Sequence, residues 1–296
     1  MSLVYIAGYD GSDGSRAALD ATIALARAEG ARVIAAHVHA QVSPMYADVG
    51  MAAGVEMYQE LRKQGEDLLA ALDAEGVDER VLLAGDPAHA LHDLAVERGA
   101  SLLAVGLTHR EGLDRLIAGS IAAGLLHGAP CPVLTVPPGR GAGAPKVIAV
   151  AFDGRPEAHR ALESATRLAG ALGGELLILA CFESPAVAAN ALGAGLDFEA
   201  DLQSAFTEVV RQAAGGVTDV PVTAQLLTGA PGQEIAQATA DGVDLLVSGS
   251  RAYGPIRRVI AGSVSRHLVD HASCPVLVIP RSAEADIDRA PQPQEG

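Results

Sequence analysis

Residues 106–138 read GLTHREGLDRLIAGSIAAGLLHGAPCPVLTVPP, and residues 249–281 repeat this pattern as GSRAYGPIRRVIAGSVSRHLVDHASCPVLVIPR. When Gly106 is placed on Gly249, the two stretches align without a gap, and many of their positions are identical. Both contain, in the same order and at the same spacing, a glycine, a Gly-Ser pair, a helical pattern and Cys-Pro-Val-Leu. Repeats so far apart in the chain indicate a duplicated domain, because solenoid repeats are only about 20 to 50 residues long.

Short apolar segments alternate with helix-length patterns in both halves. The predicted strands are residues 3–9, 33–38, 80–84, 101–106 and 132–136, and then 147–152, 175–181, 222–227, 244–249 and 275–279. The predicted helices of the first half are residues 14–29, 54–75, 87–98 and 119–128. Strands that are apolar throughout are typical of a parallel sheet covered on both faces. We therefore expect two flavodoxin-like, Rossmann-like α/β domains, each a five-stranded parallel sheet of order 3-2-1-4-5 flanked by helices.

Composition sets the domain boundaries. The stretch PPGRGAGAP is rich in Gly and Pro and has no apolar period, which predicts a linker over residues 139–145. The first domain then covers residues 1–138 and the second covers 146–281. Residues 282–296 lack core-forming side chains and are predicted to be a disordered tail.

The charge of the chain limits its partners. A formal net charge of −15 argues against nucleic acid or an anionic membrane as the main partner, because both would be repelled. The sequence has no apolar run of about 18 residues and only three cysteines, so we expect a soluble cytoplasmic protein without disulfides. Backbone amides could still hold a small anion.

Ligands of an open α/β sheet bind beyond the carboxyl ends of its strands, where the strand order reverses. The residues at these ends are Asp10, Val38, Gly85 and Gly106 in the first half, and Asp153, Cys181, Gly229 and Gly249 in the second. The two carboxylates could accept hydrogen bonds from sugar hydroxyls. Alternatively, each Asp-Gly pair only turns the chain and caps the next helix.

A second glycine segment opens the last helix of each half, as Gly119-Ser120 and Gly262-Ser263. Glycine lets the backbone approach an anion closely, and a helix N-terminus offers unpaired N–H groups. The alternative is that Gly-Ser is a common helix start and that duplicated scaffolding repeats as well.

With strand-Asp-Gly, a Gly-x-Pro turn and strand-Gly…Gly-Ser-helix-Cys-Pro-Val in both halves, the chain resembles a tandem member of the universal stress protein family. This resemblance implies an adenine nucleotide such as ATP, often with a divalent ion such as Mg²⁺. The Asp would lie near the nucleoside, the backbone of Val38 or Cys181 would read adenine, and the glycines and Gly-Ser would hold the phosphates. It also implies that the two domains pack as a pseudo-dimer through their last strands, and that the whole chain forms a homodimer.

The sequence departs from the family pattern at its second glycine, where His109 and Ala252 stand. A Cβ costs about 1 kcal/mol or more if this position needs a positive φ. Ala252 is the milder change, and Arg251, Arg257 and Arg258 surround it. We therefore predict that the second domain holds the better nucleotide site.

Catalytic motifs are missing from the sequence. It lacks a Gly-x-Ser-x-Gly elbow, a P-loop and a Gly-x-Gly-x-x-Gly turn after either first strand. We set aside a metal site at His89, His92 and Asp93, because no matching cluster occurs in the second half. The leading hypothesis is a stress-response regulator that binds ATP and is not an enzyme, with slow hydrolysis at most. The alternative is a scaffold or interaction protein of the same fold that binds no nucleotide.

Overall fold

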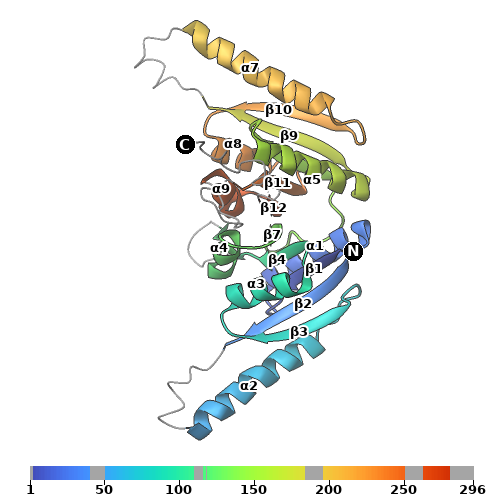
Figure 1. Cartoon of the computed structure of the whole chain (residues 1–296), viewed down its shortest axis with the longest axis vertical. Helices are drawn as coiled ribbons and strands as arrows, with labels where there is room; N and C mark the ends of the chain where they lie inside the picture. The colour runs from blue at the N-terminus through green and yellow to red at the C-terminus, as the bar shows by residue number, and fades with distance from the viewer. Residues whose placement is uncertain are drawn as a thin grey trace, which may run out of the picture.

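The computed structural model contains one continuous sheet of ten strands (Figure 1). It describes residues 3–40, 51–109, 116–117, 119–183, 196–250 and 263–280. The strands of the first half are β1 (Val4–Gly8), β2 (Arg32–His39), β3 (Glu79–Ala84), β4 (Leu102–Gly106) and β7 (Val133–Val136). Those of the second half are β8 (Val147–Phe152), β9 (Glu175–Phe182), β10 (Val222–Thr228), β11 (Leu245–Gly249) and β12 (Val276–Ile279).

The predicted strand order is confirmed in both halves. The sheet runs β10-β9-β8-β11-β12-β7-β4-β1-β2-β3, so each half follows 3-2-1-4-5. All neighbouring strands within a half are parallel. The order reverses between the first and fourth strands, so the carboxyl ends of β1 and β4 are adjacent, as are those of β8 and β11.

The two halves join through their last strands, which confirms the predicted pseudo-dimer. β7 and β12 pair antiparallel, with Leu134 opposite Leu277. The hydroxyl of Thr135 is buried at this seam and donates to the carbonyl of Val276 at 3.2 Å. The pairing turns two parallel sheets into one mixed sheet and leaves only β3 and β10 at its edges.

Two layers of helices cover the sheet. One layer contains α1 (Asp13–Glu29), α2 (Met51–Ala70), α5 (Pro156–Leu172) and α7 (Leu196–Gly215). The other contains α3 (Pro87–Arg98), α4 (Ser120–Leu126), α8 (Pro231–Ala238) and α9 (Ser263–His271). The buried side chains accordingly form two apolar clusters, one on each face. α2 and α7 lie at opposite ends of the elongated molecule (Figure 1).

The structure differs from the sequence prediction at two places. The helix predicted to reach residue 75 ends at Ala70, and the chain then turns toward β3. A two-stranded ribbon of β5 (Thr108–His109) and β6 (Leu116–Ile117), which the sequence analysis did not predict, follows β4. The sequence prediction depended on the spacing of apolar residues. Such spacing marks neither the end of a helix nor a ribbon of two-residue strands.

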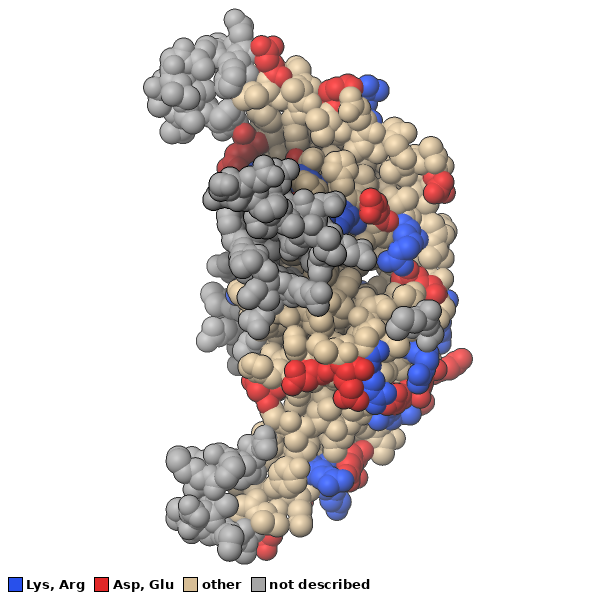
Figure 2. Space-filling model, in the orientation of Figure 1, with Lys and Arg blue, Asp and Glu red and all other residues tan. Residues whose placement is uncertain are grey.

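A pair of helices crosses the seam on one face. α1 and α5 lie beside one another, and the buried carboxylate of Glu29 bonds both Arg167 of α5 and the hydroxyl of Tyr5. Both signs of charge gather on this side of the molecule (Figure 2). Among the described residues, no helix has the length and apolar character needed to cross a membrane. The predicted tail, residues 282–296, lies outside the described residues.

Candidate functional site

Two pockets open at the carboxyl ends of the strands, one in each half, where the sequence analysis expects them. The first pocket has a volume of about 330 Å³ and lies between the ends of β1, β2 and β4 and the starts of α1, α3 and α4. The second lies at the equivalent place and has a volume of only about 90 Å³. Small-molecule sites commonly occupy about 300–1,000 Å³, so only the first falls within that range.

A network of serines holds the carboxylate of the first pocket. Asp10 Oδ1 accepts hydrogen bonds from the backbone N–H and the hydroxyl of Ser12, at 3.0 and 2.5 Å. Ser12 is the N-cap of α1, and its hydroxyl oxygen accepts from the N–H of Ser15. Desolvation alone would raise the pKa of Asp10, but the hydrogen bonds from Ser12 and Ser15 and the nearby His37 lower it. The carboxylate is therefore ionised at neutral pH.

His37 and Val38 complete the wall at the end of β2. Nδ1 of His37 lies 2.8 Å from the carbonyl oxygen of Tyr9, which can only accept, so this nitrogen carries the proton. His37 thus hydrogen-bonds the backbone of Tyr9, and it also lines the pocket.

The second pocket has the same frame but different side chains. Asp153 lies at the end of β8, where its Oδ1 accepts from the backbone N–H of Arg155 at 3.1 Å. Arg155 is the N-cap of α5 and makes no side-chain capping bond, unlike Ser12 of α1. Glu157 also lines this pocket, and its carboxylate pairs with Arg160 at 3.7 Å. It occupies the position that Gly14 holds in the first half.

Cys181 lines the second pocket at the position of Val38. Its thiol lies 3.5 Å from the carbonyl oxygen of Gly229, and burial, together with Glu234 and Glu183, raises its pKa to about 11. The thiol is therefore protonated at neutral pH and is a poor nucleophile. Burial raises the pKa of both Cys131 and Cys274 to about 12, so neither offers a reactive thiolate.

Hydroxyl groups replace apolar side chains on the floor of the second pocket. Ser248 and Ser265 lie 3.2 Å apart, and Ser265 donates to the carbonyl of Gly249 at 2.8 Å. The first half has Val105 and Ala122 at these positions. The second pocket is thus the more polar of the two at its floor, although it is smaller.

The glycines that end the fourth strands are required by packing. A Cβ on Gly106 would overlap the backbone of Gly14 in the first turn of α1. A Cβ on Gly249 would lie 2.6 Å from the carbonyl oxygen of Glu157 in α5. Both glycines line their pockets, but close contact between strand and helix already explains their presence.

The Gly-x-Pro turns have a conformational explanation. Gly85 and Gly229 have φ values of 129° and 139°, which side chains other than glycine rarely adopt. Each turn sends the chain from an edge strand into the helix that begins at Pro87 or Pro231. The predicted phosphate-binding role of these two glycines is therefore not needed to account for them.

The remaining predicted site residues divide between described and undescribed parts of the chain. Gly119 is the N-cap of α4 and lines the first pocket, and Ser120 begins that helix. Ser263 begins α9, whereas Ala252 and Gly262 lie outside the described residues. His109 is the second residue of β5.

Both halves of the chain match a known protein family. The family model described as "Universal stress protein family" matches residues 6–137 and again residues 145–280. The chain belongs to the universal stress protein family. The two matches cover nearly the whole chain, so it is a tandem member.

Other universal stress proteins are similar to this chain. One from Thermus aquaticus is 36% identical over 138 residues, which is 45% of this chain and 98% of that protein. One from Mycobacterium tuberculosis is 28% identical over 197 residues, which covers 63% of this chain and 64% of that protein. The crystal structure of a universal stress protein from Archaeoglobus fulgidus shares the fold, with a TM-score of 0.61, 23% identity and coverage of 94% of this chain and 98% of that one.

The sequence analysis missed several side chains that line the universal stress protein pockets. Ser12 and Ser15 are in the first pocket, and Arg155 and Glu157 are in the second. The alignment of the two repeats places Ser12 opposite Arg155 and Ser15 opposite Ala158. Comparing the two helix starts in this way would have shown that the first Asp has hydroxyl neighbours and the second has charged ones.

Proposed function

We propose that this universal stress protein binds an adenine nucleotide such as ATP as a regulatory ligand in the pocket of the first domain. The observation that carries the proposal is a cavity of about 330 Å³ at the strand-order reversal with an ionised carboxylate on its wall. Membership of the family supports the choice of ligand. A small ligand also agrees with the net charge of −15, which disfavours nucleic acid.

The side chains of the first pocket suit a nucleoside. Asp10 keeps acceptor capacity beyond the bonds from Ser12 and can receive hydrogen bonds from ribose hydroxyls. Val38, Leu91 and Val105 supply an apolar wall for a base, and Gly119 brings backbone to the opposite wall. Mg²⁺ would enter with the nucleotide phosphates, and we assign it no protein ligand.

The second pocket is the weaker site in this proposal. Its volume is about 90 Å³, which is below the range of about 300–1,000 Å³ that small-molecule sites commonly occupy. The sequence ranks the two sites in the opposite order, because Ala252 is a milder change than His109. That ranking stays a prediction, and variants of the two aspartates decide between the two orders.

The proposed role is regulation and not catalysis. We assign no side chain as a base for attack on the γ-phosphate, so we expect ATP hydrolysis to be slow. Phosphate release by the purified chain that is rapid and persists at high purity would contradict this part of the proposal.

The deciding experiment compares Asp10→Asn with the matched variant Asp153→Asn by calorimetric titration of the full chain with MgATP. Asp10→Asn should weaken binding about tenfold or more, while Asp153→Asn should change it less than about twofold. The reverse pattern would place the nucleotide in the second domain. A wild-type chain that binds no nucleotide, and releases none to mass spectrometry when denatured, would reject the proposal.

A second candidate function, a scaffold without nucleotide, is favoured by the packing of Gly106 and Gly249 against helix backbone. If the fold alone requires these glycines, their repetition is not evidence for phosphate binding. The calorimetric titration also tests this alternative, which requires that both pockets stay empty at millimolar MgATP.

A further inference from the structure

A groove lies on the helical face of the second domain. In the described part of the first domain, the hollow at the equivalent place is lined by different side chains. The groove lies between α5, α7 and the turn at residues 216–219, and its volume is about 780 Å³. Its apolar floor is formed by Leu162, Val209, Ala213 and Val217. The groove shares no lining residue with the pocket at Asp153, so it is a separate site.

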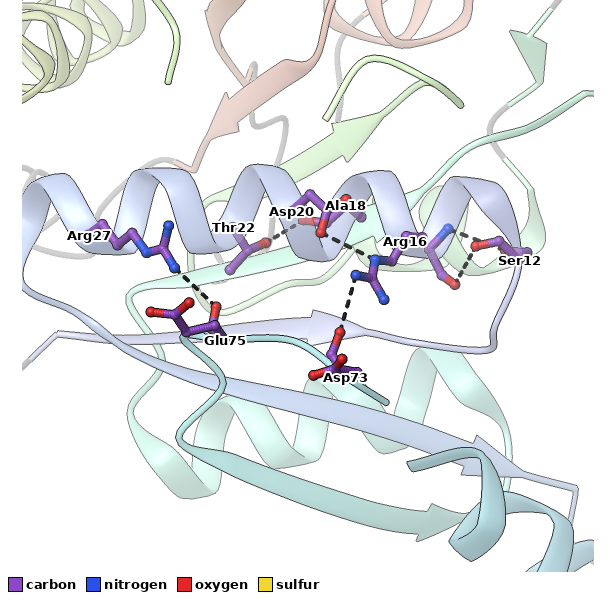
Figure 3. Close-up of polar contacts among 9 residues, drawn as sticks. Ser12, Arg16, Ala18, Asp20, Thr22, Arg27, Asp73 and Glu75 are labelled. Atoms are coloured by element: carbon purple, nitrogen blue, oxygen red, sulfur yellow. Dashed lines mark hydrogen bonds and ion pairs between the residues drawn. The ribbon is translucent and has the colours of Figure 1, made fainter. Parts of the chain in front are cut away.

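Two arginines of α1 bridge the corresponding place in the first domain (Figure 3). Arg16 donates to the carbonyl of Asp73 at 3.3 Å, and Arg27 donates to the carbonyl of Glu75 at 3.2 Å. These bonds fasten the turn after α2 to the surface of α1. The hollow beside them is lined by several charged side chains, namely Arg16, Asp20, Arg27, Asp73 and Glu75.

The second domain lacks both arginines. The alignment of the two repeats places His159 at the position of Arg16 and Gly170 at the position of Arg27. The ring of His159 instead contacts Phe152 edge-on, with 5.1 Å between centroids. Gly170 has no side chain at all, so it cannot reach across to the turn before β10 as Arg27 reaches across to the turn before β3.

The charged side chains that line the groove indicate which kind of ligand it could bind. Arg167 on its wall is already bonded to Glu29 of α1. Two exposed carboxylates also line the groove, Glu163 on α5 and Asp219 in the turn. An apolar floor with an acidic rim, on a chain of net charge −15, matches a molecule with an apolar body and one positive charge.

We propose that the groove between α5 and α7 binds a small organic cation with an apolar body, such as a protonated aliphatic amine. The apolar chain lies against Leu162, Val209 and Val217, and the ammonium group faces Glu163 and Asp219. This site is independent of the nucleotide pocket and needs no ligand there.

The test titrates the full chain with hexylammonium chloride, using hexanoate and hexanol as probes of the same chain length. We expect hexylammonium to bind about tenfold tighter or more than either control. Gly170→Arg restores the arginine of the first domain and should weaken this binding about tenfold. A Cβ at Gly170 meets only Val220 at 3.7 Å, so the variant fits the fold, and its melting temperature should rise because a helical glycine is removed.

Two further variants keep the proposal falsifiable if Gly170→Arg does not fold. The surface double variant Glu163→Gln/Asp219→Asn should abolish the preference for hexylammonium over hexanol. Arg27→Gly, the matched change in the first domain, should leave the binding within about twofold of wild type. The proposal is overturned if hexylammonium does not bind, binds no better than hexanoate, or keeps its preference in the double variant.

Discussion

The two domains have the same strand order, yet they differ at both places where a ligand can enter. The first domain has the larger pocket at the carboxyl ends of its strands, and two arginines hold a turn against α1 on its helical face. The second has a small pocket at the carboxyl ends of its strands and a groove with an apolar floor on its helical face. Duplication has thus preserved the backbone frame, while single side chains change the size of the pocket at the strand ends and the charge of the hollow on the helical face.

The difference has a simple physical origin. Strand order and the glycines that meet a helix affect the whole core, so few changes there are tolerated. The start and outer face of a helix are solvent-exposed, where most substitutions change stability by less than about 0.5 kcal/mol. Arg27 and Gly170 are at such positions, whereas Ser12 is half-buried and caps α1 with its side chain, which Arg155 does not do for α5.

The largest effect is expected at the strand–helix contacts. Gly106→Ala should destabilise the protein by about 3 kcal/mol or more, because the added Cβ overlaps the backbone of Gly14. Gly249→Ala should cost less, about 1–3 kcal/mol, because its nearest atom is the Glu157 carbonyl oxygen at 2.6 Å. Urea unfolding measures both. Equal costs would show that the two contacts are equally tight, contrary to the structure.

The ion pair between the domains should give the next effect. Arg167→Ala leaves the carboxylate of Glu29 buried with only the Tyr5 hydroxyl as partner, which should cost about 2 kcal/mol. Glu29→Gln should cost less, because the exposed guanidinium returns to water and Tyr5 keeps an acceptor. Thermal unfolding of both variants at low and high salt checks the order. A larger loss in Glu29→Gln would contradict the burial of this carboxylate.

The sequence predicted the sheet and the place where its strand order reverses, because both follow from the alternation of apolar segments with helix-length patterns. That alternation is a strong signal over short stretches of sequence. The sequence also predicted the seam through β7 and β12, on the basis of the family resemblance. It did not predict that Gly106 meets Gly14, since that contact joins residues far apart in the chain. The sequence did not predict the pocket volumes either, because they depend on how residues from several strands and helices pack around the strand ends.

The two halves also differ at one buried position, where a smaller effect on stability is expected. Ser250 Oγ is fully buried and has no hydrogen-bond partner among the described residues, whereas the first half has Leu107 at this position. An unsatisfied buried hydroxyl is unfavourable, so Ser250→Ala should stabilise the protein by about 1 kcal/mol. Leu107→Ala is the opposite control and should destabilise it by about 2–5 kcal/mol. Urea unfolding that shows a loss of stability in Ser250→Ala would mean that the hydroxyl makes a bond.

The smallest effect concerns the acid titration of Asp10, and it tests the serine network directly. Hydrogen bonds from Ser12 and Ser15 lower the pKa of Asp10 in the folded chain. A carboxyl group with a lowered folded pKa stabilises the protein above its unfolded value of about 3.9, and this stabilisation is lost as the pH falls through the folded pKa. The wild type should therefore be more stable than Asp10→Asn at pH 7, and the difference should shrink below about pH 4.

Ser12→Ala removes one bond to the carboxylate and should reduce the same pH-dependent difference. Melting temperatures of the three proteins between pH 7 and pH 3 provide the measurement. A difference that stays constant with pH would show that the serines position the loop without favouring the ionised form of Asp10.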